Sequence, residues 1–464
     1  MGSPDSDSTK LDSLRPIAES LSDAEAANLL RKIDFRVLPM LFIIYVIAFL
    51  DRANISNALT LSLPKDLGLT LQQPNTALAI FFVPYIIFEI PSNFLLKKLT
   101  PRVWLSVCIF GFGIVELAQG FVNNYSGLLA TRFFLGFFEA GIFPGSFYLL
   151  SFWYKREEAQ KRFTGYFCSV LLASAFGGLL ASAISLLDGV RGLSNWRWIF
   201  ILEGILSILV AVAAFFLVAD FPSDVTWLSP SEKQYVLSKA GRGGSAVGEN
   251  ITTADLTVFF RDPKNFCGAL MYFCSVVPIY AFAYFTPTIV KSLGFSTVQT
   301  QLHSVPPFAA ALGLCIILAY LADRTDVRLP YVLFTGALLI AGLAILITTH
   351  SHFSPEYAGI FLVCLGAFSV APLVICWYLM NLHGHQQRSI GSAWIISFGN
   401  TGGIVAPFAF LPSTAPAYRT GYSVCIAIAA LGVLTSLIYA YLISSERRKV
   451  QSNGDDKGEK KYSL

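Results

Sequence analysis

Two pairs of charged residues lie inside stretches of sequence that are otherwise apolar. Asp51 and Arg52 are adjacent, whereas Arg132 and Glu139 are seven residues apart. Seven residues make nearly two turns of α-helix, so Arg132 and Glu139 project from one face, while Asp51 and Arg52 diverge by about 100° and can address different partners. A guanidinium group binds carboxylates and a buried carboxyl can exchange a proton. These residue types therefore predict a site for an anion and for protons.

We predict that Arg52 and Arg132 present positive charge to a central cavity, with Arg132 as the principal anchor of an anionic substrate. Asp51 and Glu139 are then the groups that take up and release protons, and Glu139 is the first candidate for the coupled proton. The alternative is that the four charges neutralise one another and only lock two helices together. Close packing of small residues would serve that purpose at lower cost in a membrane, so we favour the functional interpretation.

Three further acidic residues, Glu89, Glu116 and Glu203, also lie in apolar segments. Glu89 and Glu203 are near the ends of their segments, so we interpret them as structural residues that pair with loop arginines or cap neighbouring helices. Glu116 has no evident partner in the sequence and receives no role. All seven charges fall in the first half of the chain, so the second half can offer only hydrogen bonds, aromatic faces and shape.

The second half contains polar aromatic residues at helical spacing. Tyr280 and Tyr284 are four residues apart, bracketed by Pro278 and Pro287. Prolines at these points can break a membrane helix and free carbonyl groups to line a cavity. Asn400 lies in a Gly-rich run further on. We predict that Tyr280, Tyr284 and Asn400 contact the substrate, the alternative being that the aromatic rings only pack against other helices.

The composition indicates the class of protein fold that holds these residues. The chain has 464 residues, of which 55% are hydrophobic and 13% charged, and its mean hydropathy is +0.61. Soluble domains usually carry about twice that share of charge. Six uncharged runs of 25 to 31 residues occur, and about 20 apolar residues suffice to span a bilayer as a helix. The sequence therefore predicts an all-α membrane protein with several spans and excludes an ordinary soluble enzyme.

Twelve apolar segments are long enough to be membrane helices, and a long polar stretch divides them into six and six. The expected spans are 36–58, 75–96, 103–122, 127–150, 163–186, 197–218, 266–290, 299–321, 329–349, 356–380, 389–411 and 419–444. The corresponding domains are an N-terminal tail (1–34), a first half (35–218), a central loop (219–265), a second half (266–445) and a C-terminal tail (446–464).

The basic residues of the loops set the expected orientation. With the N-terminus inside the cell, the inside segments hold 26 Lys and Arg residues and the outside segments hold 5. Positive charge concentrates on the cytoplasmic side of membrane proteins. Both termini and the central loop are therefore predicted to be cytoplasmic.

The two halves share a spacing that is typical of secondary transporters built from repeats. An arginine is followed by a glycine three residues later and by another twelve residues after that, at Arg162, Gly165 and Gly177 and again at Arg388, Gly391 and Gly403. In such transporters the substrate binds between the halves, although small residues can also match by chance. No phosphate-binding loop or metal-ligand cluster is present in the sequence, so neither an ATP-driven pump nor a metalloenzyme is expected.

Several motifs resemble a known family. Residues 321–328 (LADRTDVR) resemble a cytoplasmic signature of the major facilitator superfamily, although the counterpart at 96–102 lacks the usual Asp and Gly. Residues 49–58 (FLDRANISNA), 132–141 (RFFLGFFEAG) and 195–200 (NWRWIF) resemble the anion:cation symporter family. The resemblance is strongest to its fungal allantoate-permease-like branch, which includes carriers of nicotinate, pantothenate and allantoate.

The resemblance implies roles for individual residues. In galactonate and vesicular glutamate relatives, the arginine matching Arg132 engages the anion and the glutamate matching Glu139 is protonated. The pair matching Asp51 and Arg52 is tied to proton coupling and to attraction of the anion. We therefore expect a multi-pass transporter of the plasma membrane that takes up a small organic anion, such as a vitamin or ureide, together with protons.

Two alternatives remain open. The chain could instead export a metabolite from a biosynthetic pathway, as some carriers of the resembling branch do, or it could be a nutrient sensor that no longer transports. The short tails disfavour the sensor, because sensors carry long signalling domains. The expected partners are the organic anion, protons and the lipid bilayer, with no nucleic acid, no cofactor and a monomeric state.

Overall fold

The computed structural model describes residues 22–154, 156–239, 253–349, 353–382, 385–415 and 417–452, and every regular element in these ranges is a helix. Most of the predicted N-terminal tail, the end of the predicted C-terminal tail and the Gly-rich stretch within the central loop lie outside the described residues. Eleven described segments are long and apolar enough to cross a membrane. The predicted all-α membrane fold is therefore confirmed.

The first half of the chain contains six spans, two of which are split into shorter helices. Its helices are α2 (Asp23–Thr60), α3 (Leu63–Asp66), α4 (Gln73–Ala79), α5 (Phe82–Leu99), α6 (Pro101–Gln119), α7 (Tyr125–Glu139), α8 (Ile142–Trp153), α9 (Arg156–Ile184) and α10 (Asn195–Leu217), with short 3-10 turns η2 (Ser185–Leu187) and η3 (Val190–Gly192) before α10.

The second half repeats this plan after two short connecting helices. Its helices are α11 (Pro230–Lys239) and α12 (Thr253–Arg261) in the connection, then α13 (Pro263–Ser292), α14 (Thr297–Thr325), α15 (Leu329–Thr348), α16 (Phe353–Met380), α17 (His385–Asn400), α18 (Gly402–Ala409), the 3-10 turn η4 (Pro412–Thr414) and α19 (Arg419–Ser452). The predicted span 389–411 is thus present as two helices, α17 and α18, rather than as one long helix.

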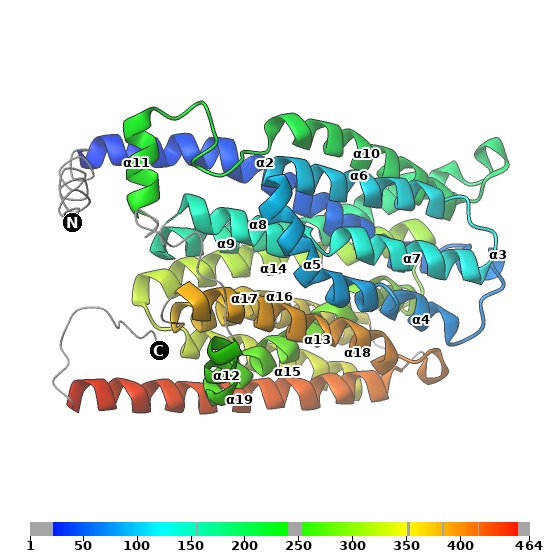
Figure 1. The fold of residues 1–464 in the computed structure, drawn as a ribbon. Helices are drawn as coiled ribbons and strands as arrows, with labels where there is room; N and C mark the ends of the chain where they lie inside the picture. The colour runs from blue at the N-terminus through cyan, green and yellow to red at the C-terminus, as the bar shows by residue number, and fades with distance from the viewer. Residues whose placement is uncertain are drawn as a thin grey trace, which may run out of the picture.

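The long helices lie side by side along one direction, with α2 beginning and α19 ending at the same end of the bundle (Figure 1). We call this the tail end, and the opposite end, which carries α3 and α18, the far end. The two halves meet where α9 packs on α14 and α2 packs on α13. These four helices bring the charged first half against the aromatic second half.

Three spans are each interrupted by a short break between two helices. The breaks fall between α4 and α5, between α7 and α8, and between α17 and α18. Pro84 and Pro144 follow the first two breaks and cannot donate a backbone hydrogen bond to the preceding turn. Interrupted helices are common where transporters bind substrates and coupling ions. Glu139 and Asn400 are each the last residue of a helix at such a break.

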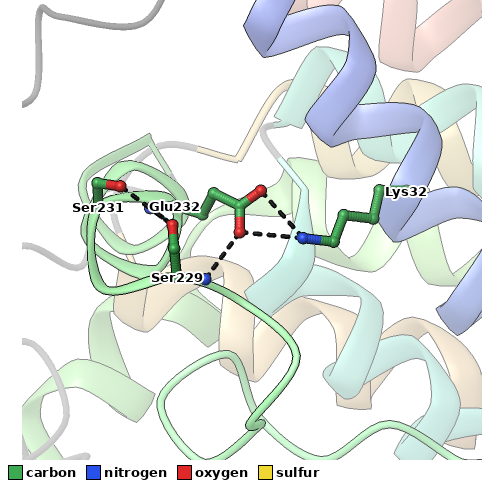
Figure 2. Close-up of polar contacts among 4 residues, drawn as sticks. All are labelled: Lys32, Ser229, Ser231 and Glu232. Atoms are coloured by element: carbon green, nitrogen blue, oxygen red, sulfur yellow. Dashed lines mark hydrogen bonds and ion pairs between the residues drawn. The ribbon is translucent and has the colours of Figure 1, made fainter.

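The connecting segment folds back onto the base of α2. Lys32 donates to both carboxylate oxygens of Glu232 at 3.0 Å, and the backbone N–H of Ser229 also donates to Glu232 (Figure 2). Trp227 stacks on Trp153 with ring centroids 5.3 Å apart. The helix α11 is therefore attached to the first half at the tail end.

Candidate functional site

A small pocket lies between the two halves. The pocket extends from Arg52 and Tyr280 towards the tail end, because its other walls come from earlier turns of α2 and α13. Its lining residues are Tyr45, Phe49, Arg52, Tyr85, Phe143, Phe167, Val170, Tyr272, Val276, Ile279, Tyr280 and Asn400.

Arg52 supplies the positive charge in the pocket wall. Its guanidinium donates to Oε1 of Glu139 through Nε, at 3.1 Å, and through Nη2, and it donates to the hydroxyl of Tyr280 through Nη1. The rings of Phe81 and Tyr85 lie 4.8 and 5.0 Å from the guanidinium carbon. Aromatic faces stabilise a cation that has left water. Arg52 is thus held as a cation between the halves, with Glu139 as its counter-ion.

Glu139 forms its ion pair with Arg52. No ion pair within 4.0 Å joins it to Arg132, which lies two turns away on the same helix, α7. Both members of the Arg52–Glu139 pair are almost completely buried. A buried ion pair is sensitive to neutralisation of either partner, because the remaining charge loses its compensation. Protonation of Glu139 would therefore release the Arg52 guanidinium for another anion.

Arg132 lies behind the pocket wall rather than on it. Its side chain is fully buried and donates over 3.4 Å to the backbone oxygens of Ala77 and Arg52. Its Nη1 has no hydrogen-bond partner among the described residues. Phe81 lies between the two arginines, 5.3 Å from the guanidinium carbon of Arg132. The structure thus places Arg52, and not Arg132, among the residues that line the pocket.

Asp51 points away from the pocket, as its angular separation from Arg52 on the helix predicts. Its Oδ2 accepts a hydrogen bond of 2.8 Å from Ser207 on α10. Glu116 and Glu203 lie beside it, with one carboxylate oxygen of each of the three residues within 4.8 Å of the others. Neither Glu203 nor the equally buried Glu89 forms an ion pair with an arginine in the described part of the chain, so the structure does not contain the first of the two structural roles considered for them.

The second half contributes Tyr280 and Asn400 to the pocket, while Tyr284 lies one turn further towards the far end. Tyr284 stacks on Tyr280 with centroids 5.7 Å apart, and its buried hydroxyl has no hydrogen-bond partner among the described residues. The prolines beside these tyrosines could have broken the helix, but α13 continues through both Pro278 and Pro287.

Hydrogen bonds join the halves on the far-end side of the pocket. Ser56 donates to the backbone oxygen of Tyr284 and Lys291 donates to that of Thr60. Closer to the end of the bundle, Asn75 donates to the backbone oxygen of Phe410 at 3.2 Å. These contacts hold the halves together between the pocket and the far end.

Several pocket residues were missed in the sequence because they carry no charge. Tyr45 and Phe49 precede Arg52 by seven and three residues, and Tyr272 precedes Tyr280 by eight. These spacings place the residues on the same helix faces as Arg52 and Tyr280. A search for aromatic residues at helical spacing from the buried charges would have found them.

The sequence and the fold both match known membrane transporters. The chain is 29% identical over 424 residues to the high-affinity nicotinic acid transporter of Saccharomyces cerevisiae, covering 91% of this chain and 79% of that protein. It is 31% identical to an uncharacterised transporter of Schizosaccharomyces pombe, covering 95% of this chain and 92% of that protein.

Among solved structures, the fold is similar to a bacterial homologue of the human lysosomal transporter Spinster in an inward-facing and occupied conformation. The TM-score is 0.65 at 15% identity, and the match covers 87% of this chain and 96% of that chain. Residues 41–407 match the sequence profile of the Major Facilitator Superfamily. The chain therefore belongs to the Major Facilitator Superfamily and is a multi-pass membrane transporter, not an enzyme.

Proposed function

We propose that this transporter takes up a small organic anion together with protons, and that the Arg52–Glu139 pair couples the two. The observation that carries the proposal is the place of Arg52: a buried cation in the wall of the pocket whose counter-ion is a carboxylate. A substrate carboxylate can replace Glu139 because both present a negatively charged carboxylate oxygen to the guanidinium donors of Arg52. The nicotinic acid relative supports a carboxylate as the substrate class.

The coupling follows from competition for one guanidinium. Glu139 must give up Arg52 when the substrate carboxylate binds, and a buried carboxylate without its counter-ion is costly unless it is protonated. Protonation of Glu139 and binding of the anion therefore favour each other, and the coupling free energy is the same in both directions. Lower pH on the side of entry should raise the affinity for the anion.

The remaining residues of the site select the anion and hold the arginines. Tyr280 and Asn400 face the bound molecule from the second half, and Tyr284 supports Tyr280 from behind. Arg132 adds positive charge next to Arg52 and becomes a direct ligand if the pocket deepens as the halves move. Alternating access opens the far end to the outside and the tail end, with both termini, to the cytoplasm.

Transport assays in proteoliposomes test this function. We would measure uptake of labelled nicotinate, pantothenate, allantoate and other carboxylates with and without an inwardly directed proton gradient. Accumulation of at least one carboxylate above equilibrium, only when the gradient is present, is the expected result. Uptake in right-side-out yeast vesicles, compared with efflux, then gives the physiological direction at the plasma membrane. Carboxylate transport that ignores the proton gradient would contradict the proposal.

A further inference from the structure

Three carboxyl groups from three different helices of the first half meet at one point. They belong to Asp51 of α2, Glu116 of α6 and Glu203 of α10, and one oxygen of each lies within 4.8 Å of the others. None of the three side chains is more than 2% exposed, and none lines the substrate pocket. We call these three residues the acid cluster.

Glycines allow two of the three helices, α6 and α10, to approach each other closely beside the acids. A Cβ atom at Gly204 of α10 would lie 2.5 Å from the backbone nitrogen of Leu117 on α6, and a Cβ at Gly113 would lie 3.0 Å from the backbone nitrogen of Ile208. Small residues allow such close approach of membrane helices. The close packing of α6 on α10 therefore brings Glu116 and Glu203 near each other.

The carboxylate oxygens of the acid cluster lack partners. Ser207 donates to Oδ2 of Asp51, but Oδ1 of Asp51 and both oxygens of Glu116 and of Glu203 have no hydrogen-bond partner among the described residues. No lysine or arginine of the described chain lies within 4.0 Å of these oxygens in an ion pair. Three negative charges at this spacing in a dry interior would repel one another at a prohibitive cost. The acid cluster must bind positive charge.

We propose that Asp51, Glu116 and Glu203 form a shared proton-binding site, distinct from the Arg52–Glu139 pair. Protons suit these groups better than a metal ion does. Hard metal ions take six or more oxygen ligands. Only one oxygen of each acid converges here, the Ser207 hydroxyl is engaged with Asp51, and the carbonyls of the continuous helices α2, α6 and α10 are engaged in backbone hydrogen bonds. A proton needs only one donor and one acceptor oxygen.

The acid cluster is placed to sense the anion site. Asp51 is adjacent to Arg52 in the chain, and the charges of Arg132 and Glu139 both act on Asp51 and on Glu116. An anion bound at the arginines reduces the positive potential at the cluster, so the cluster holds its protons more firmly. That these protons move with the substrate rests on the proposed function; that the cluster binds protons does not.

Infrared spectroscopy of the full-length protein in lipid bilayers tests proton binding without a substrate. Protonated carboxylic acids absorb in a separate carbonyl region, and we would follow this signal from alkaline to acid pH in potassium and in sodium buffers. The wild type should show protonated cluster acids at neutral pH in both buffers. Glu116→Gln and Glu203→Gln should each lose part of this signal and shift the titration of the remaining acids to lower pH by about one unit or more, because one repelling charge is gone.

Two further variants control this experiment. Glu89→Gln removes another buried acid without a hydrogen-bond partner, outside the acid cluster, so it should lose only its own signal and leave the other titrations in place. Ser207→Ala removes no acid but takes away the hydrogen bond to Asp51, so the Asp51 titration should move to higher pH. This second variant keeps the test valid if a Gln variant fails to fold.

Two results would overturn the proposal. One is that neither Glu116 nor Glu203 contributes a protonated signal at neutral pH. The other is that sodium, but not potassium, removes the signal, which would make the cluster a sodium site. Transport of labelled nicotinate in proteoliposomes separates this inference from the proposed function: proton-driven uptake without protonated cluster acids refutes the acid cluster alone, whereas protonated acids with uptake that ignores the gradient refute the proposed function alone.

Discussion

The two halves of the molecule share a helical plan but differ in what they bury. The first half buries Asp51, Glu89, Glu116, Glu139 and Glu203 together with Arg52 and Arg132. In the described helices α13 to α19, every Asp, Glu, Lys and Arg lies near a helix end, and the interior is aromatic, aliphatic or neutral polar. Ionisable groups in a membrane are costly and persist where they have a function. The first half thus handles charge and the second half provides shape and hydrogen bonds.

Arg52 connects the charged groups of the first half with the hydrogen-bonding groups of the second half. Arg52 donates at the same time to Glu139 of its own half and to the Tyr280 hydroxyl of the other. A change of charge at Arg52 therefore alters a contact that holds the halves together. This difference predicts that substitutions in the first half abolish coupled transport, whereas substitutions in the second half change which anion is preferred.

The largest effect is expected at Arg52. Arg52→Lys keeps the charge but loses the two-point fork, and Arg52→Ala loses both. Charge-assisted hydrogen bonds contribute about 1.5–3 kcal/mol each, so loss of two should lower uptake by at least about a hundredfold. Initial uptake rates at equal surface abundance give the measurement. Normal uptake by Arg52→Lys would show that transport does not need the two-point geometry of the guanidinium.

A smaller loss is expected at Arg132, which lies behind the pocket wall. Its guanidinium fork donates to two backbone oxygens, and lysine cannot reproduce that geometry. Arg132→Lys should be nearly as damaging as Arg132→Ala, with a loss of about tenfold or more in apparent affinity. Concentration dependence of uptake separates affinity from maximal rate. If Arg132→Ala transports normally, the residue has no part in the anion site.

The sequence predicts some parts of this site and not others. Charges in apolar segments point to Arg52, Arg132 and Glu139, because their cost in a membrane demands a function. The pairing of Arg52 with Glu139 depends on where the break after α7 places the carboxylate, and spacing along one helix cannot give that. The acid cluster depends on the close approach of α6 and α10, which involves contacts between separate spans.

The fold, like the site, is predicted by the sequence only in part. Lengths of apolar runs suffice to predict the spans, because a bilayer fixes the length of a helix that crosses it. Whether a proline interrupts its span depends on the surrounding packing: α13 passes through two prolines without a break, whereas Pro144 follows the break between α7 and α8.

A change of selectivity rather than a loss of transport is expected in the second half. Tyr280→Phe removes a hydroxyl that lies in the pocket and accepts a hydrogen bond from the charged Arg52, which is worth about 1.5 kcal/mol, or roughly tenfold. It should reorder competing anions more than it lowers the maximal rate. Tyr284→Phe is the matched control, because its hydroxyl has no partner among the described residues and lies outside the pocket. Equal competition profiles for wild type and Tyr280→Phe would make this tyrosine a packing residue.

The smallest effect is expected at the tail end, where α11 contacts α2. Partial burial acts to raise the pKa of Glu232, but the Ser229 backbone N–H and Lys32 outweigh it, so the pKa lies below its usual value. Because the pKa is lowered, the contact is stabilised when the pH is above the usual carboxyl pKa, and this stabilisation is lost as the pH falls through the lowered pKa.

Lys32→Ala should cost less than about 1 kcal/mol, since the pair is partly exposed. Hydrogen exchange of the α11 amides, measured as a function of pH, should show weaker protection in acid for the wild type. The variant should show a smaller pH dependence, because the Ser229 N–H still donates to Glu232. A strong pH dependence that persists in Lys32→Ala would assign the effect to another group.

In the proposed mechanism Glu139 exchanges Arg52 for a proton when the anion binds, and Glu139→Gln separates anion binding from proton transfer. The amide mimics the protonated acid permanently and cannot release a proton. Proteoliposomes carrying wild type or Glu139→Gln would be compared for accumulation of the transported carboxylate under an imposed proton gradient and for counterflow exchange without one. We expect the variant to lose gradient-driven accumulation while it retains exchange. If Glu139→Gln still concentrates the anion in response to the proton gradient, the coupled proton is not carried by Glu139 and the account is wrong.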